Sequence, residues 1–272
     1  MKSRRGETLG GFLYAKKLTR EGVCDKIFAM SNMRKITVEC KGYQIDGEFF
    51  LPDKERFPVV VMCHAMGGQM SNFHITANTF AENGIGALLF NFRGGSNFDN
   101  SGFPTQNMTL FTEKDDLFAV LDFLKKQTCV EKIFLFGASQ GGMVAAMVAE
   151  ELLDEIDGMI LLYPGFCIAD HLRQKFQTVP ETFELFHMKL GRDYVLSMRN
   201  FDTFREVGKF SKPILILHGD ADTLVPLEYS VRAAKHYRGA SLTVLENEKH
   251  GFTAKGNAKA AELALAFLKQ NL

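Results

Sequence analysis

The chain has 272 residues, enough for one large domain or two small ones, and a chain of this length can bury a core without disulfide or metal support. Its 32 basic and 32 acidic side chains cancel, which argues against a nucleic-acid-binding protein, since such proteins carry a basic excess. No apolar run approaches the length of a membrane span, and five irregularly placed cysteines do not indicate a disulfide framework, so we expect a cytoplasmic globular protein.

The first 32 residues differ from the rest of the chain, because they hold seven basic and only three acidic side chains. Their longest apolar runs, such as residues 12–15, have only four residues, which is too short for the core of a signal peptide. We therefore expect residues 1–32 to form a poorly ordered N-terminal tail and not a targeting peptide.

From residue 33 onward, short apolar segments alternate with amphipathic ones. Eight short apolar or alternating segments predict strands: residues 35–40, 44–51, 57–64, 87–92, 132–136, 159–163, 213–217 and 241–245. Helices are predicted between these strands at residues 72–83, 112–126, 141–153 and 227–236, and a closing helix follows the last strand at residues 258–268. Continuous apolar runs such as FPVVVMCH at 57–64 are typical of strands buried on both faces. The pattern predicts an α/β fold with a doubly wound, mostly parallel, eight-stranded sheet.

One interval, residues 164–212, contains no segment typical of a sheet strand. Structureless loops of this length are uncommon in compact domains, and helical patterns occur at 168–176, 181–190 and 193–204. We predict that residues 164–212 form a small cap inserted into a core made of residues 33–163 and 213–272.

The sequence Gly137-Ala138-Ser139-Gln140-Gly141 lies directly between a predicted strand and a predicted helix. It fits the G-x-S-x-G nucleophile elbow, in which the glycines let strand and helix approach closely and the serine hydroxyl stands above the sheet edge. The start of the helix supplies backbone donors and a partial positive charge for an oxyanion. This context favours Ser139 as a nucleophile over a plain glycine turn.

A serine hydroxyl needs a base to take its proton, and the base needs an acid to hold it. In this kind of site the chain order is serine, acid, histidine, and the acid follows a later strand. Asp222 follows the strand at 213–217 in an H-G-x-x-D-x-x-V-P pattern and is the predicted acid. Asp220 is interpreted as a turn residue that bonds its own backbone.

The predicted base is His250, because it is the only histidine beyond the strand at 241–245. It lies 28 residues after Asp222, room for one helix and one strand. His64 and His218 also end predicted strands near the same sheet edge, so each is a rival for this role. A histidine at a strand end is more often a structural hydrogen-bonding group.

Two backbone N–H groups are predicted to hold the oxyanion. One belongs to Gln140, directly after the nucleophile, and the second should come from the loop after the strand at 57–64. In that loop, His64-Ala65-Met66-Gly67-Gly68, the N–H of Met66 is the best candidate.

Together these motifs resemble the α/β-hydrolase superfamily, and more narrowly the bacterial feruloyl/cinnamoyl esterase-like group, over residues 33–272. The resemblance rests on the loop at 64–68, the NFRGGS loop at 91–96, and the stretches at 137–142, 218–226 and 249–252. It implies the α/β-hydrolase fold with a small cap at 164–212.

The resemblance also implies Ser139 as nucleophile, Asp222 as acid and His250 as base, with no metal and no cofactor. Two residues depart from the group's pattern. Ala65 replaces the usual glycine, and Ala138 stands where the group often has histidine. Neither change removes a catalytic atom, but both leave the substrate subgroup open.

We expect a serine hydrolase that cleaves carboxylic esters through an acyl-enzyme. The same groups serve thioesters and peptides, so an acyl-thioesterase and a peptidase-type hydrolase stay open, as does a catalytically inactive binding protein. The scattered histidines lack an H-E-x-x-H motif, and no G-x-G-x-x-G follows the first parallel strand, so neither a metal enzyme nor a dinucleotide-binding protein is indicated.

Phenylalanines in the predicted cap either line an apolar substrate pocket or form the cap's own core. The candidate pocket residues are Phe166, Phe176, Phe183 and Phe186. A pocket of this kind would favour an aromatic acyl group, such as feruloyl or cinnamoyl. The expected partner is a small-molecule ester, with no nucleic acid and no membrane, and a homodimer stays open.

Overall fold

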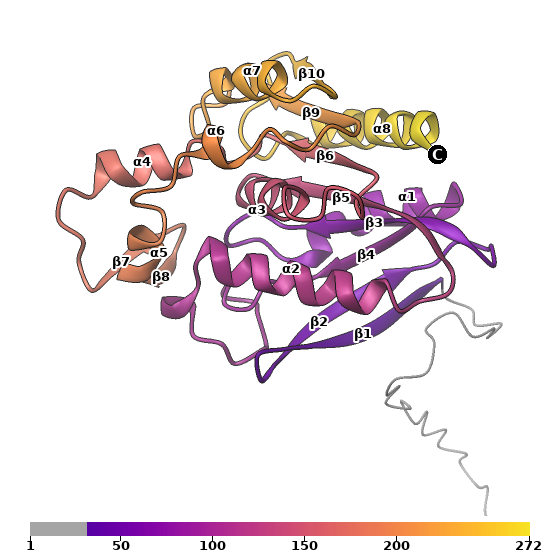
Figure 1. The fold of residues 1–272 in the computed structure, drawn as a ribbon, viewed down its shortest axis with the longest axis horizontal. Helices are drawn as coiled ribbons and strands as arrows, with labels where there is room; N and C mark the ends of the chain where they lie inside the picture. The colour runs from indigo at the N-terminus through magenta and orange to yellow at the C-terminus, as the bar shows by residue number, and fades with distance from the viewer. Residues whose placement is uncertain (1–31) are drawn as a thin grey trace, which may run out of the picture.

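The structure, a computed structural model, describes residues 32–272, so the predicted N-terminal tail lies outside it except for Asn32. Eight strands form one sheet in the order β1-β2-β4-β3-β5-β6-β9-β10 (Figure 1). Their bounds are β1 Met33–Cys40, β2 Tyr43–Phe50, β3 Phe57–Cys63, β4 Gly86–Phe90, β5 Val130–Ala138, β6 Gly158–Leu162, β9 Ile214–Gly219 and β10 Ala240–Leu245. The pairs β1–β2 and β2–β4 are antiparallel and all other pairs are parallel, which confirms the predicted fold class.

Helices cover both faces of this sheet. The larger elements are α1 His74–Glu82, α2 Leu110–Leu124, α3 Gln140–Ala149, α7 Leu227–His236 and α8 Ala254–Asn271, with short 3-10 turns η1 Met70–Phe73 and η2 Thr105–Asn107. Alternate side chains of β3 enter two separate cores: Val61 packs with the α2 and α3 side, and Val60 with the α1 and α8 side. Because both faces are buried, the strand is apolar throughout.

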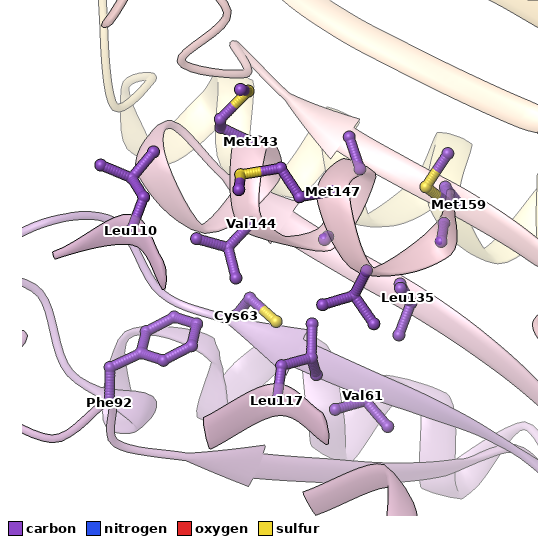
Figure 2. Close-up of a cluster of buried hydrophobic side chains, with 14 of the residues drawn as sticks. Val61, Cys63, Phe92, Leu110, Leu117, Leu135, Met143, Val144, Met147 and Met159 are labelled. Atoms are coloured by element: carbon purple, nitrogen blue, oxygen red, sulfur yellow. The ribbon is translucent and has the colours of Figure 1, made fainter. Parts of the chain in front are cut away.

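The core under α2 and α3 fixes the position of the helix that follows Ser139. Figure 2 shows Cys63 of β3 and Leu135 of β5 facing Leu117 of α2 and Val144 of α3. All four side chains have zero exposure. The start of α3 is therefore anchored by tightly packed apolar groups on the sheet.

Residues 164–212 add no strand to the main sheet. They contain α4 Ile168–Lys175, β7 Thr182–Leu185, β8 Met188–Gly191, α5 Arg192–Leu196 and α6 Thr203–Glu206, and most of this segment projects at the left of Figure 1. The division into core and cap remains a prediction about folding units. Among the described residues, no helix is both long and apolar enough to cross a membrane.

The predicted helix at 181–190 is wrong, because this segment is the antiparallel hairpin β7–β8. Exposure in β7 alternates along the strand, with Thr182 and Glu184 exposed and Phe183 and Leu185 half-buried. That period of two fits a strand with one covered face and does not fit a helix. The predicted helix at 193–204 is also broken into two short pieces, α5 and α6.

Candidate active site

Ser139 lies in the sharp turn between β5 and α3, with φ 51° and ψ −118°. L residues seldom adopt this strained conformation. The flanking glycines explain how the turn fits. A Cβ at Gly137 would lie 2.5 Å from the carbonyl oxygen of Gly141, and one at Gly141 would lie 2.4 Å from the carbonyl oxygens of Cys63 and His64. Both positions therefore require glycine so that helix and strands can approach.

The structure brings Ser139, His250 and Asp222 together from three different loops. His250 Nε2 lies 3.0 Å from Ser139 Oγ, and His250 Nδ1 lies 2.8 Å from Asp222 Oδ2. The Asp222 side chain is fully buried, and its other oxygen accepts the N–H groups of Leu224 and Val225 at 2.9 Å each. These bonds hold the carboxylate in place, so that it can orient the imidazole with Nε2 toward the hydroxyl.

Tyr163, at the end of β6, packs against the imidazole, and sequence reasoning missed it. Its ring centroid lies 4.7 Å from that of His250 and 4.7 Å from that of Phe252. Burial, with a smaller contribution from the Asp222 charge, raises the pKa of the Tyr163 phenol, so this ring stays neutral beside the histidine. The only signal in the sequence is its place directly after a buried strand.

His218, one rival for the base, is a buried structural residue. Its Nδ1 lies 2.7 Å from Ser230 Oγ, and its Nε2 lies 2.9 Å from the carbonyl oxygen of Val225 and 3.3 Å from Asp222 Oδ2. Burial lowers the pKa of His218. Both ring nitrogens are therefore occupied, and the ring joins the loop that carries Asp222 to α7.

His64, the other rival, is also held at both nitrogens. Nδ1 lies 2.8 Å from the carbonyl oxygen of Ala65, and Nε2 accepts the N–H of Phe92 at 3.1 Å. Since Nε2 accepts, Nδ1 carries the proton. Burial lowers the pKa of His64 to about 4, so the ring is neutral at pH 7. It joins the loop after β3 to the loop after β4.

Asp220 does not bond its own backbone, so that expectation is wrong. Its Oδ1 accepts the N–H of Asn247 at 2.6 Å. The reason is that β9 and β10 are neighbouring parallel strands, so the loops at their carboxyl ends lie side by side. Asp222 is the residue that bonds the backbone of its own turn.

The two N–H groups predicted to hold an oxyanion follow the neighbouring strands β3 and β5. Gln140 is the first residue of α3, so its N–H has no acceptor within the helix. Among residues 32–272, neither this group nor the N–H of Met66 donates to a protein acceptor. The loop that carries Met66 is held by the N–H of Gly67, which donates to Gly95 at 2.8 Å. Both donors are thus available to a ligand at the same sheet edge.

A buried ion pair supports this loop system. Arg93, 1% exposed, pairs through Nε with Asp116 of α2, and its backbone N–H donates to the same carboxylate at 2.9 Å. Arg93 is two residues before Gly95, whose carbonyl oxygen accepts the N–H of Gly67. The pair therefore holds the loop that contains Arg93 and Gly95, and that loop in turn holds the segment that carries Met66.

The four candidate pocket phenylalanines lie in different surroundings. Phe166 is fully buried, Phe176 and Phe183 pack on each other at 4.7 Å between centroids, and Phe186 is 48% exposed. The hairpin tip that carries Phe186 lies over the loop after β3, because a Cβ at Gly67 would lie 3.8 Å from the Phe186 carbonyl oxygen. That these four side chains contact substrate stays a prediction.

The comparisons with known proteins agree with this architecture. A family model described as serine aminopeptidase, S33, matches residues 54–200, more than half of the chain, and one described as TAP-like protein matches residues 197–271. The uncharacterized protein YqkD of Bacillus subtilis is 25% identical over 225 residues, 79% of this chain and 72% of its own length. Protein ABHD12B of Homo sapiens is 27% identical over 193 residues, 67% of this chain and only 51% of its own length.

Among solved structures, Est1E from Butyrivibrio proteoclasticus with bound ferulic acid aligns with a TM-score of 0.81 and 26% identity, covering 87% of this chain and 98% of that chain. An esterase domain from a Rhodothermus marinus protein aligns with a TM-score of 0.68 at 19% identity, covering 88% of this chain and 98% of that chain, which shows the shared fold alone. Fold and site together define a hydrolase of the α/β class. The chain belongs to the α/β-hydrolase superfamily, in the family described as serine aminopeptidase, S33.

Proposed function

We propose that this protein is a serine hydrolase that cleaves carboxylic esters through an acyl-enzyme formed on Ser139. One observation carries the proposal: the imidazole of His250 lies 3.0 Å from the Ser139 hydroxyl, with Asp222 2.8 Å behind it. A hydroxyl in this arrangement has a base within reach at neutral pH, which is what acyl transfer to serine needs.

The geometry supports the following sequence of steps. His250 removes the Ser139 proton as Oγ attacks the ester carbonyl carbon, and Asp222 stabilises the imidazolium that forms. The N–H groups of Met66 and Gln140 donate to the oxyanion. His250 then gives the proton to the leaving alcohol oxygen. Water attacks the acyl-enzyme in the same way, the acid leaves, and the proton returns to Ser139.

We further propose that aromatic acyl esters of the feruloyl or cinnamoyl type are substrates. The similar structure of Est1E holds ferulic acid, and its 26% identity extends over 87% of this chain. In this chain Phe176 and Phe183 are half-buried and pack on each other in the segment above the sheet edge. Aromatic rings of this kind can stack on a phenylpropenoyl group.

An aminopeptidase activity is the second candidate, because the matching family is described by that activity. Amide and ester hydrolysis pass through the same tetrahedral oxyanion, so Ser139, His250 and the two N–H donors serve either reaction. The difference between the two is in the groups that bind the substrate on either side of the carbonyl.

The deciding experiment compares kcat/KM of the full chain on four substrates: a 4-nitrophenyl butyrate ester, methyl ferulate, an acyl-thioester and an aminoacyl 4-nitroanilide. We expect the two esters to be turned over fastest, and Ser139→Ala to lower kcat by about 10⁶ by analogy with other triads. Faster turnover of the anilide would favour the aminopeptidase, and faster turnover of the thioester a thioesterase. Ester turnover that survives Ser139→Ala would contradict the proposal.

A further inference from the structure

The side chain of Gln140, the residue directly after Ser139, is buried behind the elbow with 2% exposure. Its amide oxygen accepts a hydrogen bond of 2.6 Å from the hydroxyl of Tyr194. Tyr194 lies on α5, within the segment 164–212, and is also 2% exposed. A single tyrosine hydroxyl thus reaches from this segment to the residue whose backbone N–H is a proposed oxyanion donor.

The peptide plane between Ser139 and Gln140 carries that N–H group on one side and the Ser139 carbonyl on the other. Its orientation depends on a strained torsion pair at Ser139, with φ 51° and ψ −118°, which the surroundings must hold in place. The Ser139 carbonyl oxygen accepts the N–H of Gly165 at 2.7 Å. Both Gly165 and Tyr194 belong to residues 164–212. This segment therefore bonds the carbonyl end of the peptide plane directly, and it bonds the other end through the side chain of Gln140.

The electrostatic surroundings suit a donor hydroxyl at this position. Burial raises the pKa of Tyr194 well above its ordinary value, so the phenol keeps its proton. Glu113 of α2 lies beside the Gln140 amide, and burial raises the pKa of its carboxyl well above the usual range, against a smaller lowering by that amide. This shift favours the uncharged form of the carboxyl and so opposes a negative charge behind the oxyanion.

We propose that Tyr194 is a positioning residue: through the Gln140 side chain it holds the peptide whose N–H donates to the oxyanion. In this proposal the bond from Tyr194 to Gln140 is the contact of the segment 164–212 on which the oxyanion donor depends. This inference rests on the proposed function, since it assigns a role to the same oxyanion donor.

A double-mutant cycle tests the inference on the full chain, with Tyr194→Phe, Gln140→Met and the double variant. Methionine keeps the length of the side chain and removes the acceptor. We expect Tyr194→Phe to lower kcat on 4-nitrophenyl butyrate by about 10-fold to 100-fold, with KM within about twofold, because only the transition state uses the N–H. In the Gln140→Met background the same change should have no further effect.

A second readout is the affinity for a trifluoromethyl ketone, which forms a hemiketal oxyanion on the serine. We expect this affinity to fall in Tyr194→Phe by about the same factor as kcat/KM. The matched control is Tyr229→Phe, which removes a bond of 2.7 Å from the Tyr229 hydroxyl on α7 to Asp170 on α4, away from Gln140. Its kcat should stay within about twofold of wild type.

Three results would overturn the inference: unchanged kcat in Tyr194→Phe, an equal loss in both Gln140 backgrounds, or an equal loss of kcat in Tyr229→Phe. Failure of the proposed function has a different signature. Wild-type protein would then neither turn over the ester nor bind the ketone, or Ser139→Ala would retain turnover, and both proposals would fall together. If the effects of Tyr194→Phe and Gln140→Met are additive but ester turnover still depends on Ser139, only the positioning role of Tyr194 is contradicted.

Discussion

Two aspartates only two residues apart in the loop after β9 have opposite surroundings. The side chain of Asp222 is fully buried and bonds His250, whereas Asp220 is exposed and bonds the backbone of Asn247. An amide at position 222 would remove the carboxylate that accepts a hydrogen bond from Nδ1–H of His250, and it would favour the wrong tautomer of that ring.

We therefore expect Asp222→Asn to lower kcat by about 10⁴, and Asp220→Asn to change it by less than about fivefold. Steady-state kinetics on one ester, with a thermal melt for each variant, checks both numbers. A larger loss of kcat in Asp220→Asn than in Asp222→Asn would show that the acid is wrongly assigned.

The buried ring of His64 makes stability depend on pH. Its pKa is about 4 in the folded protein against 6.5 for an unperturbed histidine, so the unfolded chain binds a proton that the folded state rejects between these values. Stability from this residue is complete above pH 6.5 and is lost as the pH falls toward 4. Integrating the difference in bound protons between the unfolded and the folded state gives about 2–3 kcal/mol of lost stability at pH 4.5.

His64→Asn keeps a donor near the Ala65 carbonyl oxygen and cannot titrate. The free energy of unfolding is measured in urea at pH 7 and at pH 4.5. Between these two pH values, we expect it to fall by about 2–3 kcal/mol more in wild type than in this variant. Equal losses in the two proteins would show that His64 is not buried in its neutral form.

At the scale of elements, the strand, turn and helix around Ser139 could be predicted because their signals are local. Gly137 and Gly141 are required by contacts within a few residues and with the adjacent β3, and the apolar run before them marks a buried strand. The hairpin β7–β8 could not be predicted in this way. Its turn residues Phe186 and His187 both have positive φ, yet neither is a glycine or asparagine, so no turn signal appears in the sequence.

At the scale of the whole molecule, the triad could be predicted because chain order and sheet order agree. Ser139, Asp222 and His250 follow β5, β9 and β10, and the carboxyl ends of parallel strands meet at one edge. The contacts of Gly165 and Tyr194 with the elbow could not be predicted. They depend on how residues 164–212 pack on the sheet, and that segment has short elements without a repeating apolar pattern.

The central claim is that Ser139 forms a nucleophile with His250 as its base. Its most direct test is labelling of the full chain with a fluorophosphonate, followed by peptide mass mapping. We expect one adduct, on Ser139, that is absent in Ser139→Ala and forms slower by several orders of magnitude in His250→Ala. An adduct on another residue, or labelling of wild type no faster than of His250→Ala, would contradict the account.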